Sequence, residues 1–466
     1  MENFDLIIIG GGAGAFASAI KANELKAKIL MVNSGLPLGG TCVNVGCVPS
    51  KTLLWAGEVM HLAKSHNIPG IDIEVKNFDF ATVVQHELDL VEKLRAEKYE
   101  RVLRNLEHVT HLEGKAVFVS PNEIEIDGQE YTAKKFIIAA GSTATIPPIE
   151  NIREVGYITH VEALKLKQQP KELIIIGAGP VGLEFAQMYA RFGTKVTILH
   201  KGQSIFRGEE ELTTRLAEIL TNEGITIKTN VQVKSARKEG DKKVLTYTIK
   251  GREEQVSADE ILLATGKTPN TQGLNLDKAG VEIDEKQAIK VNPQFQTSQR
   301  HIYAVGDVTN APLRLEPTAG REGTLAAENA LNNAQNSIDY NSVPWTIFTD
   351  PQLAGVGFTE EEQMKKFGTC MCKTVSFKDV PKALIIGRTE GLIKMAIHPE
   401  TKEIMGVHIL APNAGELIAE AMMLIKNKNT IDDVVNSLPM FPTLSESIKL
   451  AALSFTTDLT KLSCCV

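Results

Sequence analysis

The chain contains two copies of one pattern, in which a strand leads through a glycine-rich turn into a helix. This repeat limits its fold more than any other feature. Apolar runs at residues 6–9 and 173–176 each lead into such a turn and then into a helix-compatible stretch. The turn glycines are Gly10, Gly12 and Gly14 in the first copy and Gly177, Gly179 and Gly182 in the second. Glycine lets backbone N–H groups approach a pyrophosphate, which the following helix N-terminus attracts. Two copies predict an α/β chain that binds two dinucleotides, as in enzymes that relay hydride from nicotinamide to flavin.

The second strand of each copy, residues 28–32 or 195–199, ends where a side chain is expected to read the ribose. An acid there usually accepts the 2′-hydroxyl of NAD. The second copy instead has His200 and Lys201, with Arg207 shortly after, so a 2′-phosphate would meet cations and NADPH is favoured. A merely solvated run of charges would have the same sequence.

Six cysteines form three close pairs: Cys42 with Cys47, Cys370 with Cys372, and Cys464 with Cys465. A structural disulfide framework is not expected in an intracellular chain of this size. The spacing of the first pair suits a helical turn, where a helix N-terminus lowers a thiol pKa; two buried structural cysteines are the alternative. The second pair is expected on one face of a strand, in a structural role, with an accessory metal site as the alternative.

Composition and charge narrow the partners. A net charge of -7 argues against nucleic acid and anionic membranes, which leaves small molecules. The first residues read as a strand without a basic flank, which predicts a cytoplasmic protein with no signal peptide or membrane span. A long charged helix is expected over residues 80–107, beside the first domain, and an apolar helix over residues 411–426.

The segment 39–51 carries a specific resemblance. Its sequence, GGTCVNVGCVPSK, is similar to the redox-active signature of the pyridine nucleotide–disulfide oxidoreductases, class I, and residues 264–270 and 303–307 resemble other segments of that family. The resemblance implies two Rossmann-like dinucleotide-binding domains, for FAD and NAD(P)H, and a C-terminal α+β dimerisation domain. The expected boundaries are 1–148 with 268–342 for FAD, 149–267 for NADPH, and 343–466 for dimerisation.

The same resemblance implies roles for individual residues. Cys47 would be the thiolate against the flavin and Cys42 the outer, exchanging thiol, while Lys51 and Glu184 would form an ion pair beside the flavin ring, a solvated surface pair being the alternative. The expected FAD residues are Gly10, Gly12, Gly14, Ala15, Asn33, Gly40, Thr41, Lys51, Ala116, Gly141, Asp307 and Leu315. The expected NADPH residues are Gly177, Gly179, Gly182, His200, Lys201, Arg207 and Gly266.

Asn33 departs from the family pattern, which has a glutamate for the adenosine ribose of FAD. An amide can still hydrogen-bond a hydroxyl, but without charge assistance, so somewhat weaker FAD binding is expected. Asp307 is expected to hold the ribityl chain.

Two features near the C-terminus point to the substrate. Disulfide reductases of the family have a proton-donating histidine where this chain has Phe441, which argues against disulfide reduction. The ending Ser463-Cys464-Cys465 resembles the tail of mercuric reductases, and vicinal thiols suit a soft metal ion.

That resemblance implies a homodimer in which Cys464 and Cys465 of one subunit pass Hg(II), the substrate, to Cys42 and Cys47 of the other for reduction to Hg(0). An NADPH-dependent disulfide reductase that uses the terminal pair as a shuttle is the alternative, and an inert tail is another. Pro317 and Phe441 stand where tyrosines commonly lie near the metal, and Glu316 is adjacent to Pro317, so the metal ligation is expected to differ. An N-terminal metal-binding domain with a Cys-x-x-Cys motif is not expected.

Overall fold

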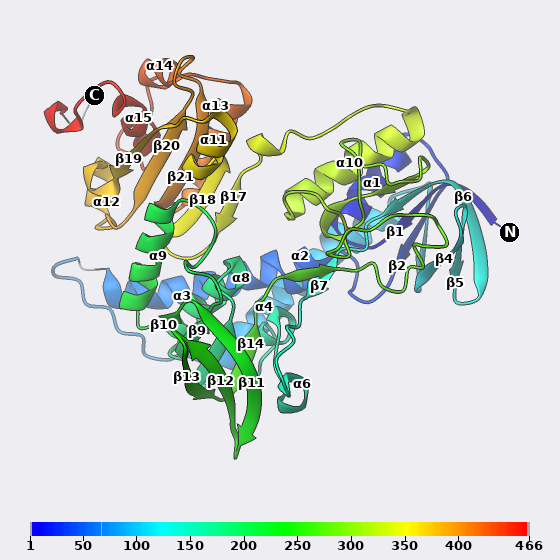
Figure 1. The fold of residues 1–466 in the computed structure, drawn as a ribbon, viewed down its shortest axis with the longest axis horizontal. Helices are drawn as coiled ribbons and strands as arrows, with labels where there is room; N and C mark the ends of the chain where they lie inside the picture. The colour runs from blue at the N-terminus through cyan, green and yellow to red at the C-terminus, as the bar shows by residue number, and fades with distance from the viewer. Residues whose placement is uncertain (1, 67, 464–466) are drawn as a thin grey trace.

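A computed structural model describes residues 2–66 and 68–463. Figure 1 shows three blocks: a sheet at the N-terminal end, a second group of strands in green, and a C-terminal unit in yellow to red. Two sheets with parallel strands, each covered by helices, and a C-terminal antiparallel sheet with its own helices confirm the predicted α/β fold with a C-terminal α+β unit.

The first sheet is parallel at its centre and antiparallel at one edge. Strands β1, β2, β3, β6 and β16 run parallel, and β4 and β5 continue the sheet as an antiparallel hairpin. Its strand order is β3 (Val109–Glu113), β2 (Ile29–Asn33), β1 (Glu2–Ile9), β6 (Gln129–Ile138), β5 (Glu123–Ile126) and β4 (Ala116–Ser120). Strand β16 (Ile302–Ala304) pairs with the last three residues of β6, beyond the part of β6 that pairs with β5.

Both faces of β1 are buried, which explains its unbroken apolar sequence. Leu6 and Ile8 pack into the cluster that holds the alanines of α1 (Ala13–Glu24) and α10 (Glu316–Asn332), whereas Ile7 and Ile9 face the opposite cluster. The turn after β1 therefore lies at the carboxyl edge of a sheet that is covered on both sides, where dinucleotides bind in such folds.

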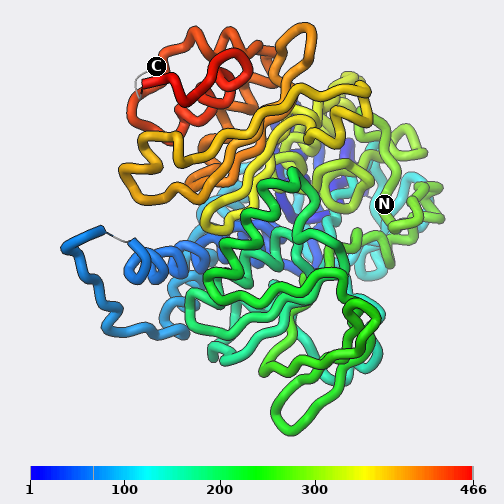
Figure 2. The backbone as a smooth tube through the Cα atoms, turned by 60° about the vertical axis from the view of Figure 1, so that its left-hand side comes forward, coloured from blue at the N-terminus to red at the C-terminus, as the bar shows by residue number. Residues whose placement is uncertain are grey.

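The second nucleotide-type unit also has a parallel sheet that is buried on both faces, but different elements pack on it. Its parallel sheet has the order β10 (Thr226–Lys228), β9 (Lys195–Leu199), β8 (Glu172–Ile176) and β14 (Glu260–Leu263). Helix α8 (Pro180–Phe192) packs with Leu173 and Ile175, and Ile174 and Ile176 face an antiparallel meander. The meander, at the bottom of Figure 2, is formed by β11 (Val231–Glu239), β12 (Lys242–Ile249) and β13 (Arg252–Ala258). A short ribbon of β7 (Ser142–Ala144) and β15 (Lys267–Pro269) connects the two units.

The helix expected over residues 80–107 bridges both units instead of lying beside the first alone. It consists of α4 (Phe80–Arg95), a π-helical turn (Ala96–Glu100) and α5 (Arg101–Arg104). Phe80 packs on Tyr189 and Phe192 of α8, and Tyr99 packs edge-on against Phe16 of α1. Sixteen residues of α4 alone span about 24 Å, enough to reach from one unit to the other. The predicted packing beside the first domain is therefore confirmed at Tyr99, and α8 of the second unit is an additional packing partner.

The C-terminal unit is an antiparallel sheet covered by helices (Figure 1). Its strand order is β17 (Trp345–Ile347), β18 (Gln352–Gly357), β21 (Ile404–Ala411), β20 (Leu392–Ile397) and β19 (Met371–Ser376). Its helices are α11 (Glu360–Phe367), α12 (Pro381–Ile385), α13 (Ala414–Lys426), α14 (Ile431–Val435) and α15 (Glu446–Leu453). Helix α13 begins three residues later than predicted, because Ala411 still belongs to β21 and Asn413 has a positive φ of 57°.

The remaining helices connect these units. They are α2 (Gly40–Val45), α3 (Cys47–Ser65), α6 (Ile152–Val155), α7 (His160–Ala163), α9 (Glu210–Asn222) and the 3₁₀ turns Gly306–Val308, Tyr340–Ser342, Phe377–Asp379 and Leu459–Lys461. Over residues 2–66 and 68–463, no helix has the length and apolar composition needed to cross a membrane. The domain boundaries given above remain a prediction.

Candidate active site

One cavity of about 2610 Å³ runs from the first glycine turn, past Cys42 and Cys47, to the second turn. Pockets for a single small molecule are typically about 300–1,000 Å³, so this space accommodates more than one such ligand. Gly141, Gly179 and Gly266 line it, and each has open space where a Cβ would stand. Side chains at these positions would enter the cavity, which fits two extended dinucleotides lying close to backbone.

The first glycine turn is held by close backbone contacts. Gly10 has a φ of +136°, and a Cβ there would lie 2.2 Å from the carbonyl oxygen of Ala139. A Cβ on Gly40 would come within 2.6 Å of the Cα of Gly12, so the glycine turn and the loop before Cys42 pack backbone to backbone. Residues other than glycine would separate them.

Cys42 and Cys47 occupy two consecutive helices. Cys42 lies in the first turn of the short α2, and Cys47 is the first residue of the 19-residue α3, after Gly46. A helix N-terminus carries a partial positive charge that favours an anion. Both side chains line the cavity, and both are free cysteines in this structure.

The two thiols have opposite pKa shifts. The Cys42 thiol hydrogen-bonds to the sulfur of Cys47, and this bond is the main reason why the pKa of Cys42 is raised and that of Cys47 is lowered to about 7. Burial opposes the lowering at Cys47, and the nearby charge of Lys51 adds to it. The negative charge of Glu316 raises the pKa of both thiols. Cys47 is therefore the thiolate and Cys42 the protonated partner near neutral pH.

Lys51 and Glu184 form an ion pair across the two nucleotide-type units. Lys51 Nζ, one helical turn after Cys47, lies 2.7 Å from Glu184 Oε2 on α8. The Glu184 side chain is only 5% exposed, which argues against a solvated surface pair. The backbone N–H of Phe348 donates to Glu184 Oε1 at 2.9 Å, and the Phe348 ring lies 4.5 Å from Lys51 Nζ. Sequence reasoning missed Phe348, because nothing near it in sequence marks it as a neighbour of α8.

Most residues predicted to bind FAD line the cavity. They are Gly10, Gly12, Gly14, Asn33, Gly40, Thr41, Lys51, Ala116, Gly141, Asp307 and Leu315. Ala15 is instead fully buried in the core of the first unit, where it packs with α10. The Asp307 carboxylate accepts a hydrogen bond from Ser142 Oγ at 2.7 Å and pairs with Lys267 at 3.0 Å, so it is held at the cavity wall.

Asn33, at the end of β2, has a carboxylate beside it that sequence reasoning missed. Its Nδ2 donates to the carbonyl of Leu36 at 3.0 Å and to Glu113 Oε2, at the end of the neighbouring β3, at 3.2 Å. Register pairing places Asn33 directly against Glu113. The negative charge of Glu113 therefore lies one strand away from the place of the glutamate in the family pattern. No local sequence motif predicts this position.

Some of the residues predicted to bind NADPH at the second glycine turn line the cavity, and others do not. Gly177, Gly179, Gly266, His200 and Lys201 line the cavity. A Cβ on Gly182 would lie 2.1 Å from the Gly177 carbonyl oxygen, so this glycine allows α8 to pack against the turn. Arg207 is exposed and is not part of the cavity wall.

His200 is a neutral imidazole in this structure, and its role at a 2′-phosphate stays a prediction. Its Nδ1 accepts a hydrogen bond from the backbone N–H of Ala178 at 3.1 Å, which requires an unprotonated Nδ1. Burial and the neighbouring charge of Lys201 both lower the pKa of His200. Of the three predicted basic residues, Lys201 is the one that combines a full charge with a place in the cavity wall.

The residues that bear on the substrate are only partly brought together. Glu316 and Pro317, at the start of α10, line the cavity. Phe441 is 44% exposed and lies outside the cavity wall of its own chain. Cys464 and Cys465 lie outside the described residues.

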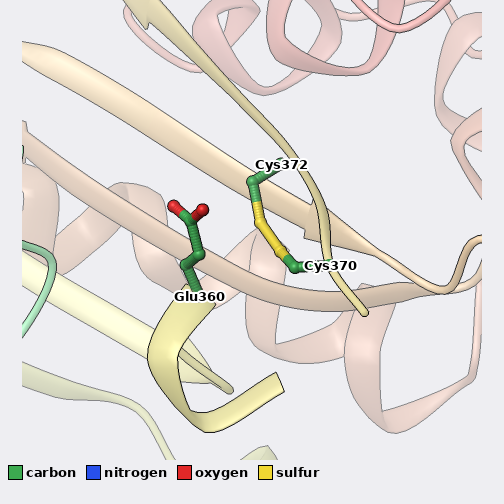
Figure 3. A group of neighbouring side chains, drawn as sticks. All are labelled: Glu360, Cys370 and Cys372. Atoms are coloured by element: carbon green, nitrogen blue, oxygen red, sulfur yellow. A yellow bond between two sulfur atoms is a disulfide. The ribbon is translucent and has the colours of Figure 1, made fainter. Parts of the chain in front are cut away.

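Cys370 and Cys372 are joined by a disulfide, a bridge that the sequence analysis did not predict (Figure 3). Cys372 belongs to β19, whereas Cys370 immediately precedes that strand. Side chains two residues apart in an extended segment point the same way, which brings the sulfurs together.

Two protein-family models match nearly the whole chain. The model described as pyridine nucleotide-disulphide oxidoreductase matches residues 4–337, and the one described as pyridine nucleotide-disulphide oxidoreductase, dimerisation domain, matches residues 343–452.

Several characterised proteins are similar over their length. The chain is 38% identical to a mercuric reductase of Staphylococcus aureus, covering 99% of this chain and 84% of that protein. It is 38% identical to a mercuric reductase of Streptomyces lividans (99% and 98% covered) and 37% identical to a dihydrolipoyl dehydrogenase of Thermus scotoductus (97% and 97%). Among solved structures, the Cu(II) complex of an HOCl-induced flavoprotein disulfide reductase from Escherichia coli superimposes with a TM-score of 0.86 at 26% identity, covering 98% of this chain and 100% of that one.

Proposed function

Because the chain belongs to the pyridine nucleotide-disulphide oxidoreductase family, with FAD and NADPH as its cofactors, we propose that it reduces Hg(II) to Hg(0). When bound, NADPH and FAD supply the two electrons that Hg(II) takes up, with release of NADP⁺ and one proton. Because the reaction consumes NADPH, we place it in the cytoplasm.

The thiolate–thiol pair in the cavity carries the proposal. Soft thiolates select soft metal ions, and Hg(II) accepts two sulfur ligands. The Cys47 thiolate is ready to bind near neutral pH, and the raised pKa of Cys42 means that this thiol gives up its proton when the metal binds. Capture of Hg(II) by the pair thus releases one proton from Cys42.

The surrounding charges suit a cation that arrives at this pair. Lys51 stabilises the Cys47 thiolate, while Glu184 and Phe348 hold the Lys51 ammonium in place. The carboxylate of Glu316 adds negative charge near the two sulfurs, which attracts a dication and disfavours an anionic disulfide substrate.

Phe441 supports a metal substrate from a different direction. A disulfide substrate leaves as a thiolate that needs a proton, and phenylalanine has none to give. Reduction of Hg(II) requires no proton at the leaving atom. The alignments with mercuric reductases over 99% of the chain agree with this choice.

We propose that Hg(II) reaches the cavity through Cys464 and Cys465 of the partner subunit in a homodimer. The dimerisation-domain match at residues 343–452 supports the homodimer. Leu438 and Met440, close to Phe441, are 94% and 76% exposed, which is unusual for large apolar side chains unless another surface covers them. The two terminal thiols would exchange Hg(II) from small thiols to the cavity pair.

The deciding experiment measures NADPH oxidation by the flavin-loaded protein with Hg(II) in excess small thiol, together with volatile mercury. We expect one Hg(0) for each NADPH, turnover lost in Cys42→Ser/Cys47→Ser, and turnover weakened under thiol competition in Cys464→Ala/Cys465→Ala. Oxidised glutathione, thioredoxin and lipoamide are run in parallel. Turnover with a disulfide and none with Hg(II) would overturn the proposal.

Disulfide reduction is the second candidate, because the flavoprotein disulfide reductase superimposes closely and dihydrolipoyl dehydrogenases align at similar identity. In that case Cys464 and Cys465 would act as a shuttle. The substitution Phe441→His introduces the histidine of the disulfide reductases and distinguishes the two candidate functions. It should raise any disulfide turnover and leave Hg(II) turnover unchanged.

A further inference from the structure

A second thiol pair lies outside the cavity, at the edge of the C-terminal sheet. Cys370 and Cys372 share one face at the start of the edge strand β19, and the side chain of Glu360, the first residue of α11, lies beside them (Figure 3). One ligand atom from each of these three residues lies within 4.8 Å of the others. None of the three lines the active-site cavity.

We propose that reduced Cys370 and Cys372, with Glu360 as third ligand, bind a thiophilic divalent cation of the Zn(II), Cd(II) or Hg(II) class. Two sulfurs and one carboxylate oxygen are ligands that such ions accept. The disulfide of the structure is then the closed form of the site. A low-molecular-weight dithiol reduces the S–S bond to two thiols and itself becomes a cyclic disulfide, and the cation then displaces both thiol protons.

A structural disulfide alone does not explain this arrangement. A bridge between residues two apart closes a minimal loop, and the stabilisation from a disulfide grows with loop length. The Glu360 carboxylate, which pairs with Lys394, also lies close enough to both sulfurs to complete the ligand set of a cation held by two thiolates.

The charges around Glu360 also favour an additional cation. Lys394 is 6% exposed and pairs with Glu360 at 2.5 Å, Glu209 at 3.0 Å and Glu211 at 3.5 Å. His408, against Glu209, adds no compensating charge near neutral pH, because burial lowers its pKa to about 4. Three carboxylates thus contact one ammonium group in this part of the described structure, which leaves an excess of negative charge.

Glu360 can turn to a cation without breaking the contact between units. When the Glu360 carboxylate moves to the cation, Lys394 on β20 still forms ion pairs with Glu209 and Glu211 at the start of α9. Thr374 of β19 also donates to Glu211 at 2.6 Å, so the edge strand stays anchored to α9. Occupation of the site is therefore expected to leave the fold and the active site unchanged.

Cd(II) binding to a protein that retains only this pair tests the proposal. The variant Cys42→Ser/Cys47→Ser/Cys464→Ser/Cys465→Ser is loaded with FAD, reduced with a phosphine, and freed of reductant without oxygen. The disulfide takes two electrons from the phosphine and, with the two protons of one water molecule, forms two thiols, while the oxygen of that water molecule goes to the phosphine oxide. Equilibrium dialysis and the ultraviolet thiolate-to-metal absorption measure binding. Cd(II) is not reduced, so the result does not depend on the proposed mercury chemistry.

We expect one tightly bound Cd(II) per chain, and no tight Cd(II) in the matched protein that also carries Cys370→Ser/Cys372→Ser. Glu360→Gln should weaken Cd(II) binding about tenfold without changing the stoichiometry. Unchanged flavin absorbance and circular dichroism show that each variant is folded. A pair that resists excess phosphine, the absence of stoichiometric binding, or equal binding by the matched control would overturn the site.

Discussion

The two glycine turns have nearly the same backbone, but the strand ends beside them differ. Gly10 and Gly177 have φ values of +136° and +115°, and a Cβ on either would lie 2.2 Å from a backbone carbonyl oxygen. At the first turn, Asn33 turns sideways to Glu113. At the second, His200 turns back to the N–H of Ala178.

The comparison separates two tasks. The turn backbone sets where a diphosphate can lie, and it is shared because the steric demand is the same in both units. The side chain at the strand end distinguishes one ribose from another, and its environment depends on neighbouring strands. Four predictions test this division, in order of decreasing expected effect.

The largest effect is expected from alanine at the equivalent turn glycines. The added methyl group meets a backbone oxygen in a conformation that alanine rarely adopts, at a cost of about 2–4 kcal/mol. We expect Gly10→Ala to lose at least about tenfold in FAD content, and Gly177→Ala to keep FAD but bind NADPH at least about tenfold more weakly.

Flavin absorbance and NADPH titration measure these two losses. Gly224→Ala is the matched control, since Gly224 has a φ of +92° but open space around its Cβ position. If both turn variants lost the same cofactor, the two units would not be separate nucleotide sites.

The next effect concerns Lys201, the basic residue in the wall of the second site. Its removal takes away a charge-assisted hydrogen bond to the 2′-phosphate, so Lys201→Ala should raise KM for NADPH about tenfold and leave that for NADH unchanged. Arg207→Ala serves as control and should change either value less than twofold. Equal effects of Lys201→Ala on both nucleotides would contradict the assignment.

A smaller effect is expected where the two units meet, at Lys51 and Glu184. The charge of Lys51 lowers the pKa of Cys47, which is about 7, so the reactive thiolate forms as pH rises through this value. Because the Lys51→Met variant lacks this charge, the pKa of Cys47 rises in it. Alkylation of Cys47 at pH 7 should therefore slow roughly threefold or more. Peptide mass spectrometry across a pH series gives the midpoint. The Lys51→Arg variant should have a midpoint near that of the parent protein. An unshifted midpoint in Lys51→Met would rule out this charge effect.

The smallest effect is expected at the first strand end. Glu113 supplies the negative charge beside Asn33, and Glu113→Gln should raise the Kd for FAD by about threefold to fivefold. Titration of the apoprotein with FAD, followed by flavin fluorescence, measures this change. Glu130→Gln, on the far end of the same sheet, is the control. An unaltered Kd would mean that Asn33 acts without Glu113.

Sequence reasoning succeeded where a local pattern carries the physical cause. The turn glycines, the buried strands and the position of Cys47 at a helix start follow from short-range sterics and periodicity. It did not predict that α8 of the other unit also packs on the helix over residues 80–107, or that the ring of His200 accepts a hydrogen bond from the backbone of Ala178. The Cys370–Cys372 bridge was also not expected.

By itself, the sequence determined the family, the α/β fold, two dinucleotide sites and the cysteine pair between them, because each depends on residues close together in the chain. Tertiary structure alone decided which side chains lie together at those sites. Asn33 meets Glu113 across 80 residues, Lys51 meets Glu184 across 133, and Glu184 meets Phe348 across 164. Charge and hydrogen bonding depend on distance in space, and strand register and domain packing bring these residues together.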